Sequence, residues 1–133
     1  MIGWPKRPAK KRRKKHQDSI LQRKDGTCYL CRMLHNDIRI KPYTEEHHIF
    51  YGTARREKSE AEGLKVYLCE EHHRTGREAV HLNHAISRRL QAAAQKAWEE
   101  QPGHDRRGWM DLMGRNYRDE EDEDIRGQGE DDP

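Results

Sequence analysis

The sequence predicts a small α+β fold, in which two short strands and a set of C-terminal helices surround a structural metal. Three observations predict it. Two segments alternate apolar and polar residues, a later segment has apolar residues at helical spacing, and every cysteine belongs to one array with histidines. Only 32% of the 133 residues are hydrophobic and 38% are charged. A domain with so little apolar core is expected to need a metal or disulfides.

Charge divides the chain into three parts. Residues 1–15 contain eight lysines and arginines and no acid, whereas residues 118–133 contain nine acids and two arginines. Blocks of like charge are typical of disordered tails. We therefore expect a basic disordered arm over 1–17, one folded domain over 18–117, and an acidic disordered tail after it. No apolar run approaches the roughly 18 residues of a membrane span, and no signal peptide is recognisable, so we expect an intracellular protein without membrane contact.

Short elements are expected through the first half of the domain. Alternating stretches are expected to pair as a hairpin whose ends bring the cysteines and histidines together. In order, the elements are a turn at Asp25-Gly26, a short strand over 38–41, a strand over 43–50, a polar loop over 52–62 and a strand over 64–68.

Two helices are expected in the second half, after a turn at 74–77. Ile86, Leu90 and Trp98 fall at helical spacing, which predicts a helix from residue 82 or 83 to residue 100. Pro102 follows as a stop signal, and Asp105 is a candidate N-cap for a last short helix. The apolar face of that last helix would comprise Trp109, Leu112, Met113 and Tyr117.

The cysteines occur at spacings typical of a tetrahedral zinc site. Cys28 and Cys31 are separated by two residues, and so are Cys69 and His72. Zinc accepts histidine as a fourth ligand, and an odd number of cysteines in a chain without a secretion signal argues against a disulfide framework. The spacing therefore predicts a structural Zn²⁺ held by these four residues.

Three histidines beside this array have no role in the zinc site: His47, His48 and His73. Because His47 and His48 are adjacent in an expected strand, their side chains face opposite ways, so one can bind a metal while the other reaches a substrate. An imidazole can take a proton from water near neutral pH. These histidines are therefore candidates for catalysis.

The order of these motifs resembles that of the HNH endonucleases. It runs Cys-x-x-Cys, His-His-Ile and then Leu-Cys-x-x-His-His, and over roughly residues 25–117 it is similar to the phage-type, RecA-dependent recombination-enhancement nucleases. The resemblance implies a ββα-metal core with a structural zinc and flanking C-terminal helices. It also implies metal-dependent hydrolysis of DNA linked to recombination or DNA processing, in the cytoplasm of a bacterial host and encoded by a phage or prophage.

The resemblance also implies roles for the spare histidines. His47 and His73 would bind the catalytic cation, Mg²⁺ or another divalent ion, and His48 would be the general base. A third metal-binding histidine, expected one helical turn after His73, falls on Arg77, which cannot bind a cation. The nearest candidate is His81, with an ordinary helix-entry residue as the alternative.

One residue of the family pattern is missing. Many members carry an asparagine ahead of the second strand, near Gly63 in this chain, and no asparagine is present there. The residue that orients the general base is therefore unassigned.

DNA is the expected partner, and a RecA-type recombinase filament is a further partner implied by the resemblance. Phosphate contacts are expected from the basic arm and from the polar loop. The alternative for the arm is a solubilising, non-specific tail or, in a eukaryote, a nuclear-import signal, and the alternative for the loop is a plain solvated surface. A non-catalytic zinc module that binds DNA or RNA is the alternative function, but it gives no reason for the spare histidines. A protein-interaction role of the charged tails is a third possibility. The candidate DNA-binding residues are Lys11, Arg12, Arg13, Lys14, Arg55 and Arg56.

Overall fold

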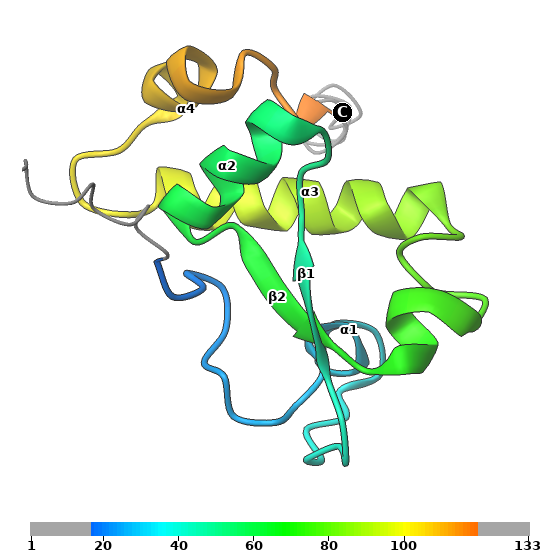
Figure 1. The fold of residues 1–133 in the computed structure, drawn as a ribbon. Helices are drawn as coiled ribbons and strands as arrows, with labels where there is room; N and C mark the ends of the chain where they lie inside the picture. Colours follow the sequence, from blue (N-terminus) through cyan, green and yellow to red (C-terminus); the bar gives the residue numbers. More distant parts are fainter. Residues whose placement is uncertain (1–16, 120–133) are drawn as a thin grey trace, which may run out of the picture.

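The computed structural model describes residues 17–119 as a two-stranded sheet surrounded by helices, which confirms a small α+β architecture (Figure 1). The arm up to residue 16, with Lys11, Arg12, Arg13 and Lys14, and the tail from residue 120 lie outside the described residues. In chain order the elements are α1 (Tyr29–His35), β1 (Glu45–His48), α2 (Thr53–Glu62), β2 (Lys65–Leu68), the short π-helical turn η1 (Glu71–Thr75), α3 (His84–Glu99) and α4 (Arg106–Met113).

The two strands pair antiparallel, with His47 opposite Val66 and His48 opposite Lys65. Because side chains alternate along a strand, each such pair shares one face of the sheet. Val66 is fully buried on the face that carries His47, as is Leu68 two residues on. The strands predicted over 43–50 and 64–68 are thus present, in shorter form, and the alternation of Leu64, Val66 and Leu68 correctly assigns the core face of β2.

The connection between the strands is a helix, so the prediction of a polar loop over 52–62 was wrong. Residues 53–62 are rich in alanine, arginine, glutamate and lysine, all of which have high helix propensity. Gly63 ends α2 in the left-handed conformation, with φ of 73°. The sequence concealed this helix because its one buried residue, Ser59, leaves no apolar stripe to detect.

The segment before β1 also differs from its prediction. Residues 38–41 form no strand, and Ile38 and Ile40 are 67% and 74% exposed. Asp37 instead bonds to both Arg39 and Lys41, which folds the segment back on itself. Upstream, the turn that carries the first two cysteines opens the unanticipated helix α1.

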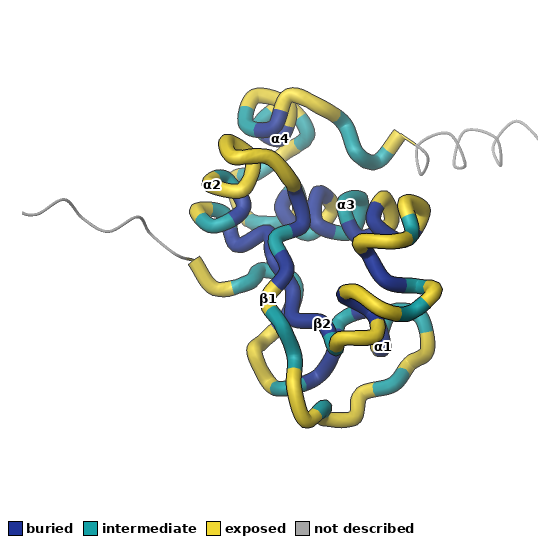
Figure 2. The backbone as a smooth tube through the Cα atoms, turned by 45° about the vertical axis from the view of Figure 1, so that its right-hand side comes forward, coloured by how far each residue is buried: buried dark blue, intermediate teal, exposed yellow. Residues whose placement is uncertain are grey.

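The two predicted C-terminal helices are present and close the core. Asn83 caps α3 by accepting hydrogen bonds from two backbone amides, and Asp105 caps α4 by accepting one from Gly108 N. The fully buried Trp109 of α4 packs its ring 5.6 Å from Phe50, which follows β1. Buried residues run along β2 and one side of α3, whereas His47 is the one buried residue of β1 (Figure 2). Among the described helices, none is both long and apolar enough to cross a membrane.

Candidate metal centres

Three cysteines and a histidine converge where α1 meets the end of β2. Cys28 is the N-cap of α1 and Cys31 lies in its first turn, whereas Cys69 follows β2 and His72 lies in η1. His72 Nδ1 is 3.3 Å from Cys31 Sγ and 3.4 Å from Cys69 Sγ. Cys28 Sγ lies 3.8 Å from the same nitrogen. The four predicted residues are close enough to hold a metal ion.

Burial controls the chemistry of these thiols. It raises the pKa of Cys31 to about 12, with the neighbouring Cys28 and Cys69 adding to the effect, and it raises the pKa of Cys28 as well. The thiols of Cys28 and Cys31 therefore stay protonated in the absence of a cation. A bound cation stabilises the thiolate, so metal binding at this cluster is coupled to proton release.

A carboxylate supports the histidine of this cluster. His72 directs Nδ1 at the thiols and places Nε2 3.4 Å from Glu78 Oε1. The same oxygen lies 2.6 Å from His35 Nε2, and this hydrogen bond lowers the pKa of Glu78. Glu78 thus connects His35 to the histidine of the cluster. Carboxylates that bond the far nitrogen of a ligand histidine orient its ring toward the metal.

A second cluster is formed by three histidines from three parts of the chain. His47 comes from β1, His73 from η1, and His81 from the segment between η1 and α3. His73 Nε2 and His81 Nε2 are 3.1 Å apart, and the ring centre of His47 lies 5.2 Å from each of the other two. The structure therefore brings the candidate His81 to the two histidines that were expected to bind a catalytic cation.

His47 is the most constrained member of this histidine cluster. Its side chain is 3% exposed, and its Nε2 is buried without a hydrogen-bond partner. A buried polar atom of this kind is costly unless something binds it. Burial, reinforced by the neighbouring histidines, lowers the pKa of His47 to about 3. The ring is therefore neutral at physiological pH, as a metal ligand must be.

Glu45 fixes the orientation of a second member. Its Oε1 lies 2.6 Å from His73 Nδ1, and this hydrogen bond lowers the pKa of Glu45 to about 2. A carboxylate accepts hydrogen bonds, so Nδ1 of His73 carries the proton and its Nε2 presents a lone pair to the cluster. Glu45 was not predicted, although its position two residues before His47 on one strand face was a signal for it.

His48 lies on the opposite face of β1. Its Nε2 hydrogen-bonds to Glu60 of α2, and Glu46 Oε1 is 3.9 Å from the same nitrogen. Lys65 places Nζ 3.4 Å from Glu46 and 3.6 Å from Glu60. Burial disfavours the lysine charge, yet the two carboxylates outweigh it and raise the pKa of Lys65. Because this lysine already neutralises the carboxylates, the group is better explained as an ion-pair network than as a cation site.

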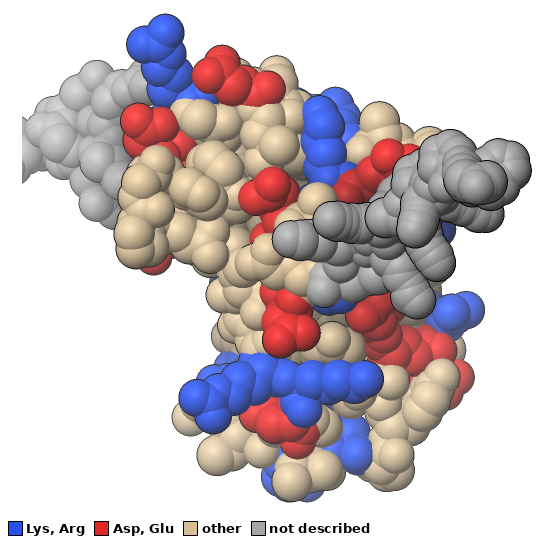
Figure 3. Space-filling view, turned by 60° about the vertical axis from the view of Figure 1, so that its left-hand side comes forward, with Lys and Arg blue, Asp and Glu red and all other residues tan. Residues whose placement is uncertain are grey.

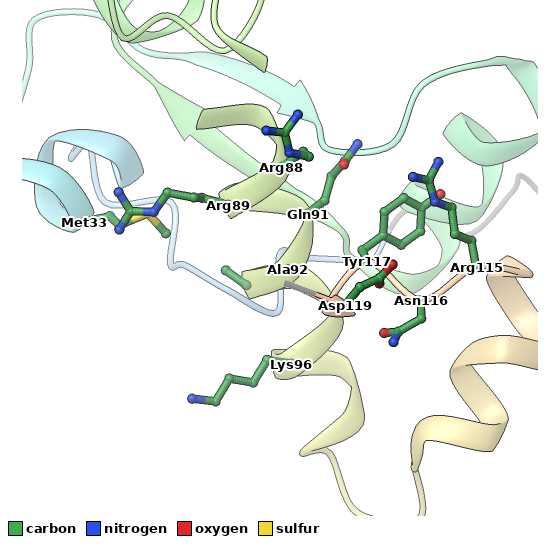
Figure 4. A pocket seen from close by; sticks show the side chains of 11 residues that line it. Met33, Arg88, Arg89, Gln91, Ala92, Lys96, Arg115, Asn116, Tyr117 and Asp119 are labelled. Carbon is green, nitrogen blue, oxygen red and sulfur yellow. The ribbon is translucent and has the colours of Figure 1, made fainter. Parts of the chain in front are cut away.

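The mixture of basic and acidic side chains differs between parts of the described surface. On the face in Figure 3 the two kinds are intermixed. A groove along α3, with a volume of about 510 Å³, is different because four basic side chains and one carboxylate, Asp119, line it (Figure 4). Ala92 and Ala93 also line it, and its basic residues are Arg88, Arg89, Lys96 and Arg115.

Phe50 and Tyr51 lie between this groove and the histidine cluster. Tyr117 of the groove packs its ring 4.8 Å from Phe50, and the next residue, Tyr51, has its ring 6.1 Å from that of His47. Tyr51 also places its hydroxyl 3.2 Å from Ser87 of α3, beside Arg88. The predicted Arg55 and Arg56 are exposed in the first turn of α2.

Comparison of the chain with protein-family models, curated proteins and solved structures gives no match.

Proposed function

We propose that the protein is a metal-dependent HNH endonuclease with a ββα-metal core, which hydrolyses phosphodiester bonds in DNA. The observation that carries the proposal is that the two adjacent histidines, His47 and His48, lie on opposite faces of β1. His47 enters a histidine cluster with a buried, unpartnered nitrogen, whereas His48 faces the other side of the same strand. A zinc module without catalysis requires the Cys/His cluster but gives no reason for a second, histidine-only cluster.

The Cys/His cluster is proposed to hold a structural zinc. Zinc binds thiolate at about 2.3 Å and imidazole at about 2.0–2.1 Å, so ligand atoms of a tetrahedral site lie about 3.5–3.8 Å apart. Cys31 Sγ lies 3.3 Å from His72 Nδ1 and 3.9 Å from Cys69 Sγ, and these two separations bracket that range. Such a metal would compensate for the small apolar core.

His47, His73 and His81 are proposed to hold the catalytic divalent cation. When bound, such a cation supplies stabilisation of the negative charge on the phosphate and the leaving 3′ oxygen. Three neutral imidazoles suit a first-row transition ion better than Mg²⁺, which prefers oxygen ligands. Among the divalent ions that the family resemblance allows, the donor set therefore favours a transition ion over Mg²⁺.

His48 is proposed as the general base. It takes a proton from the attacking water as the water oxygen bonds to phosphorus, and the bond from phosphorus to the 3′ oxygen breaks. An imidazole can perform this step because its ordinary pKa is close to neutral. The 17% exposure of its side chain leaves it open to solvent while the ring is held in place.

DNA is proposed as the substrate because the described surface carries a groove lined by four basic side chains on and beside α3, the helix that Tyr51 contacts through Ser87. Side chains such as Arg89 and Lys96 can neutralise backbone phosphates. The arm of residues 1–15 would add sequence-independent affinity. A link to recombination, and contact with a RecA-type filament, follow from the motif resemblance and belong to the same proposal.

The test is a cleavage assay with the full-length, zinc-loaded protein. Supercoiled plasmid, single-stranded DNA and RNA are incubated with Mn²⁺, Ni²⁺, Zn²⁺, Mg²⁺ or EDTA. We expect cleavage of DNA with a transition ion, none with EDTA, and a roughly 10²–10⁴-fold lower rate for His48→Ala. His84→Ala, an exposed histidine outside both clusters, should cleave normally. Nucleic-acid binding without cleavage under every condition would support the non-catalytic module instead.

A further inference from the structure

His48 is held by a residue from a different element. Its Nε2 hydrogen-bonds to Oε1 of Glu60, which lies in the last turn of α2, and both side chains are only 17% exposed. The contact spans twelve positions along the chain. It therefore depends on how α2 packs against the sheet.

The chemistry of this contact determines the tautomer of His48. An ionised carboxylate can only accept hydrogen bonds, so in the neutral ring Nε2 must carry the proton that is shared with Glu60. Nδ1 then has the free lone pair. Among residues 17–119, the structure provides no hydrogen-bond partner for Nδ1 of His48. This nitrogen is therefore the one able to take a proton from water.

Glu60 is itself fixed in place. Its second carboxylate oxygen lies 3.6 Å from Nζ of Lys65, whose side chain is 7% exposed. Two backbone hydrogen bonds connect the end of α2 to the residues that flank the strands. Leu64 N, just before β2, donates to Ser59 O of α2, and Ile49 N, just after β1, donates to Leu64 O. Glu60 thus reaches His48 from a position with little freedom to move.

We propose that Glu60 is the positioning residue of His48, which holds Nε2–H so that Nδ1 faces the reacting water. It would take the role left open by the asparagine that is missing near Gly63. The link to catalysis rests on the proposed nuclease function, but the effect on the His48 ring does not. Glu60 acts through His48 and need not touch the substrate.

The first experiment determines by NMR which ring nitrogen of His48 carries the proton, without substrate or catalytic cation. The zinc-loaded full chain is labelled with ¹⁵N-histidine, and the His48 signals are identified by their loss in His48→Asn. We expect wild-type His48 to be protonated at Nε2, with an imidazole proton that is protected from exchange by its hydrogen bond. Glu60→Ala should lose that protection. Glu60→Gln, which preserves shape but can donate as well as accept, should weaken it. Glu57→Ala, an exposed glutamate one turn earlier on α2, should leave the signal unchanged.

The second experiment measures cleavage by the same variants. We expect kcat of Glu60→Ala to fall roughly 10–100-fold with little change in KM, because ring orientation is lost while substrate binding is retained. Glu57→Ala should cleave as the wild type does. Zinc content and circular dichroism report whether each variant is folded. If Glu60→Ala is not folded, the result for Glu60→Gln tests the positioning role.

Different outcomes would contradict the positioning role of Glu60 and the proposed nuclease function. A wild-type His48 protonated at Nδ1, or an unchanged Nε2–H signal in both Glu60 variants, would overturn the positioning role even in an active nuclease. An inactive wild type with the expected ring signals would instead remove the nuclease proposal and retain Glu60 as the residue that sets the His48 tautomer.

Discussion

Glu45 Oε1 lies 2.6 Å from Nδ1 of His73, so a residue of β1 orients a histidine of η1 toward the histidine cluster. Because Glu45 is two positions before His47, one strand face supplies both a cluster histidine and the support of another. Arg74 Nε approaches the same carboxylate oxygen at 3.1 Å and helps to hold it.

We expect Glu45→Ala to weaken cation binding at the histidine cluster about 10–100-fold, because support of this kind typically has that effect on affinity. The measurement is isothermal titration of a transition ion into protein that already contains its structural zinc. Glu70→Ala is the matched control, since Glu70 is exposed and its side chain caps no helix. Equal affinity in the two variants would contradict a supporting role for Glu45.

The Cys/His cluster predicts a protein that folds only with its metal. We expect elemental analysis to find zinc that survives mild chelation, and Cys28→Ala to lose both the zinc and the folded circular-dichroism spectrum at 25 °C. The physical reason is that metal binding supplies most of the folding free energy in a domain with so small a core. Folded, cooperative protein that contains no zinc would rule this out.

The pKa of His47 predicts a stability that depends on pH. Folding lowers this pKa to about 3, so between about pH 6.5 and 3 the unfolded chain binds a proton that the folded chain does not. Stability is therefore highest above pH 6.5 and falls as the pH decreases toward 3, by up to about 1.4 kcal/mol per pH unit. Urea unfolding from pH 7.5 to 5, without added divalent ions, should show a steeper loss for wild type than for His47→Gln. Both proteins contain the zinc site, so its own pH dependence is common to the two. Parallel curves of stability against pH would contradict the lowered pKa of His47.

The groove on α3 predicts a difference in salt dependence. We expect Arg89→Glu combined with Lys96→Glu to weaken DNA binding and to reduce the slope of log K against log salt by about 2, since each lost phosphate contact removes roughly 0.9. Fluorescence anisotropy in EDTA measures binding without cleavage. Arg23→Glu combined with Arg107→Glu makes the same charge change at exposed sites outside the groove. If both pairs lose affinity equally, the groove is not a specific contact surface.

Local pattern was enough to predict the parts of the fold that depend on neighbours in the chain. The two-residue spacings of Cys28 with Cys31 and of Cys69 with His72 place each pair on one turn, and the structure brings all four together. The apolar periodicity of α3 and the capping residue Asp105 of α4 were likewise readable, because helix packing and capping involve residues within a few positions. By contrast, α2 was missed because almost none of it is buried.

Tertiary structure determined which residues contact and orient the histidines. His81 reaches His73 because the chain turns after η1, a path that no spacing rule predicts. Glu60 reaches His48 and Glu78 reaches His72 for the same reason, since each carboxylate is positioned by packing and not by sequence separation. Ligand identity is a property of residue type and local spacing, which the sequence determines. Ligand orientation depends on contacts between distant elements, which exist only once the chain has folded.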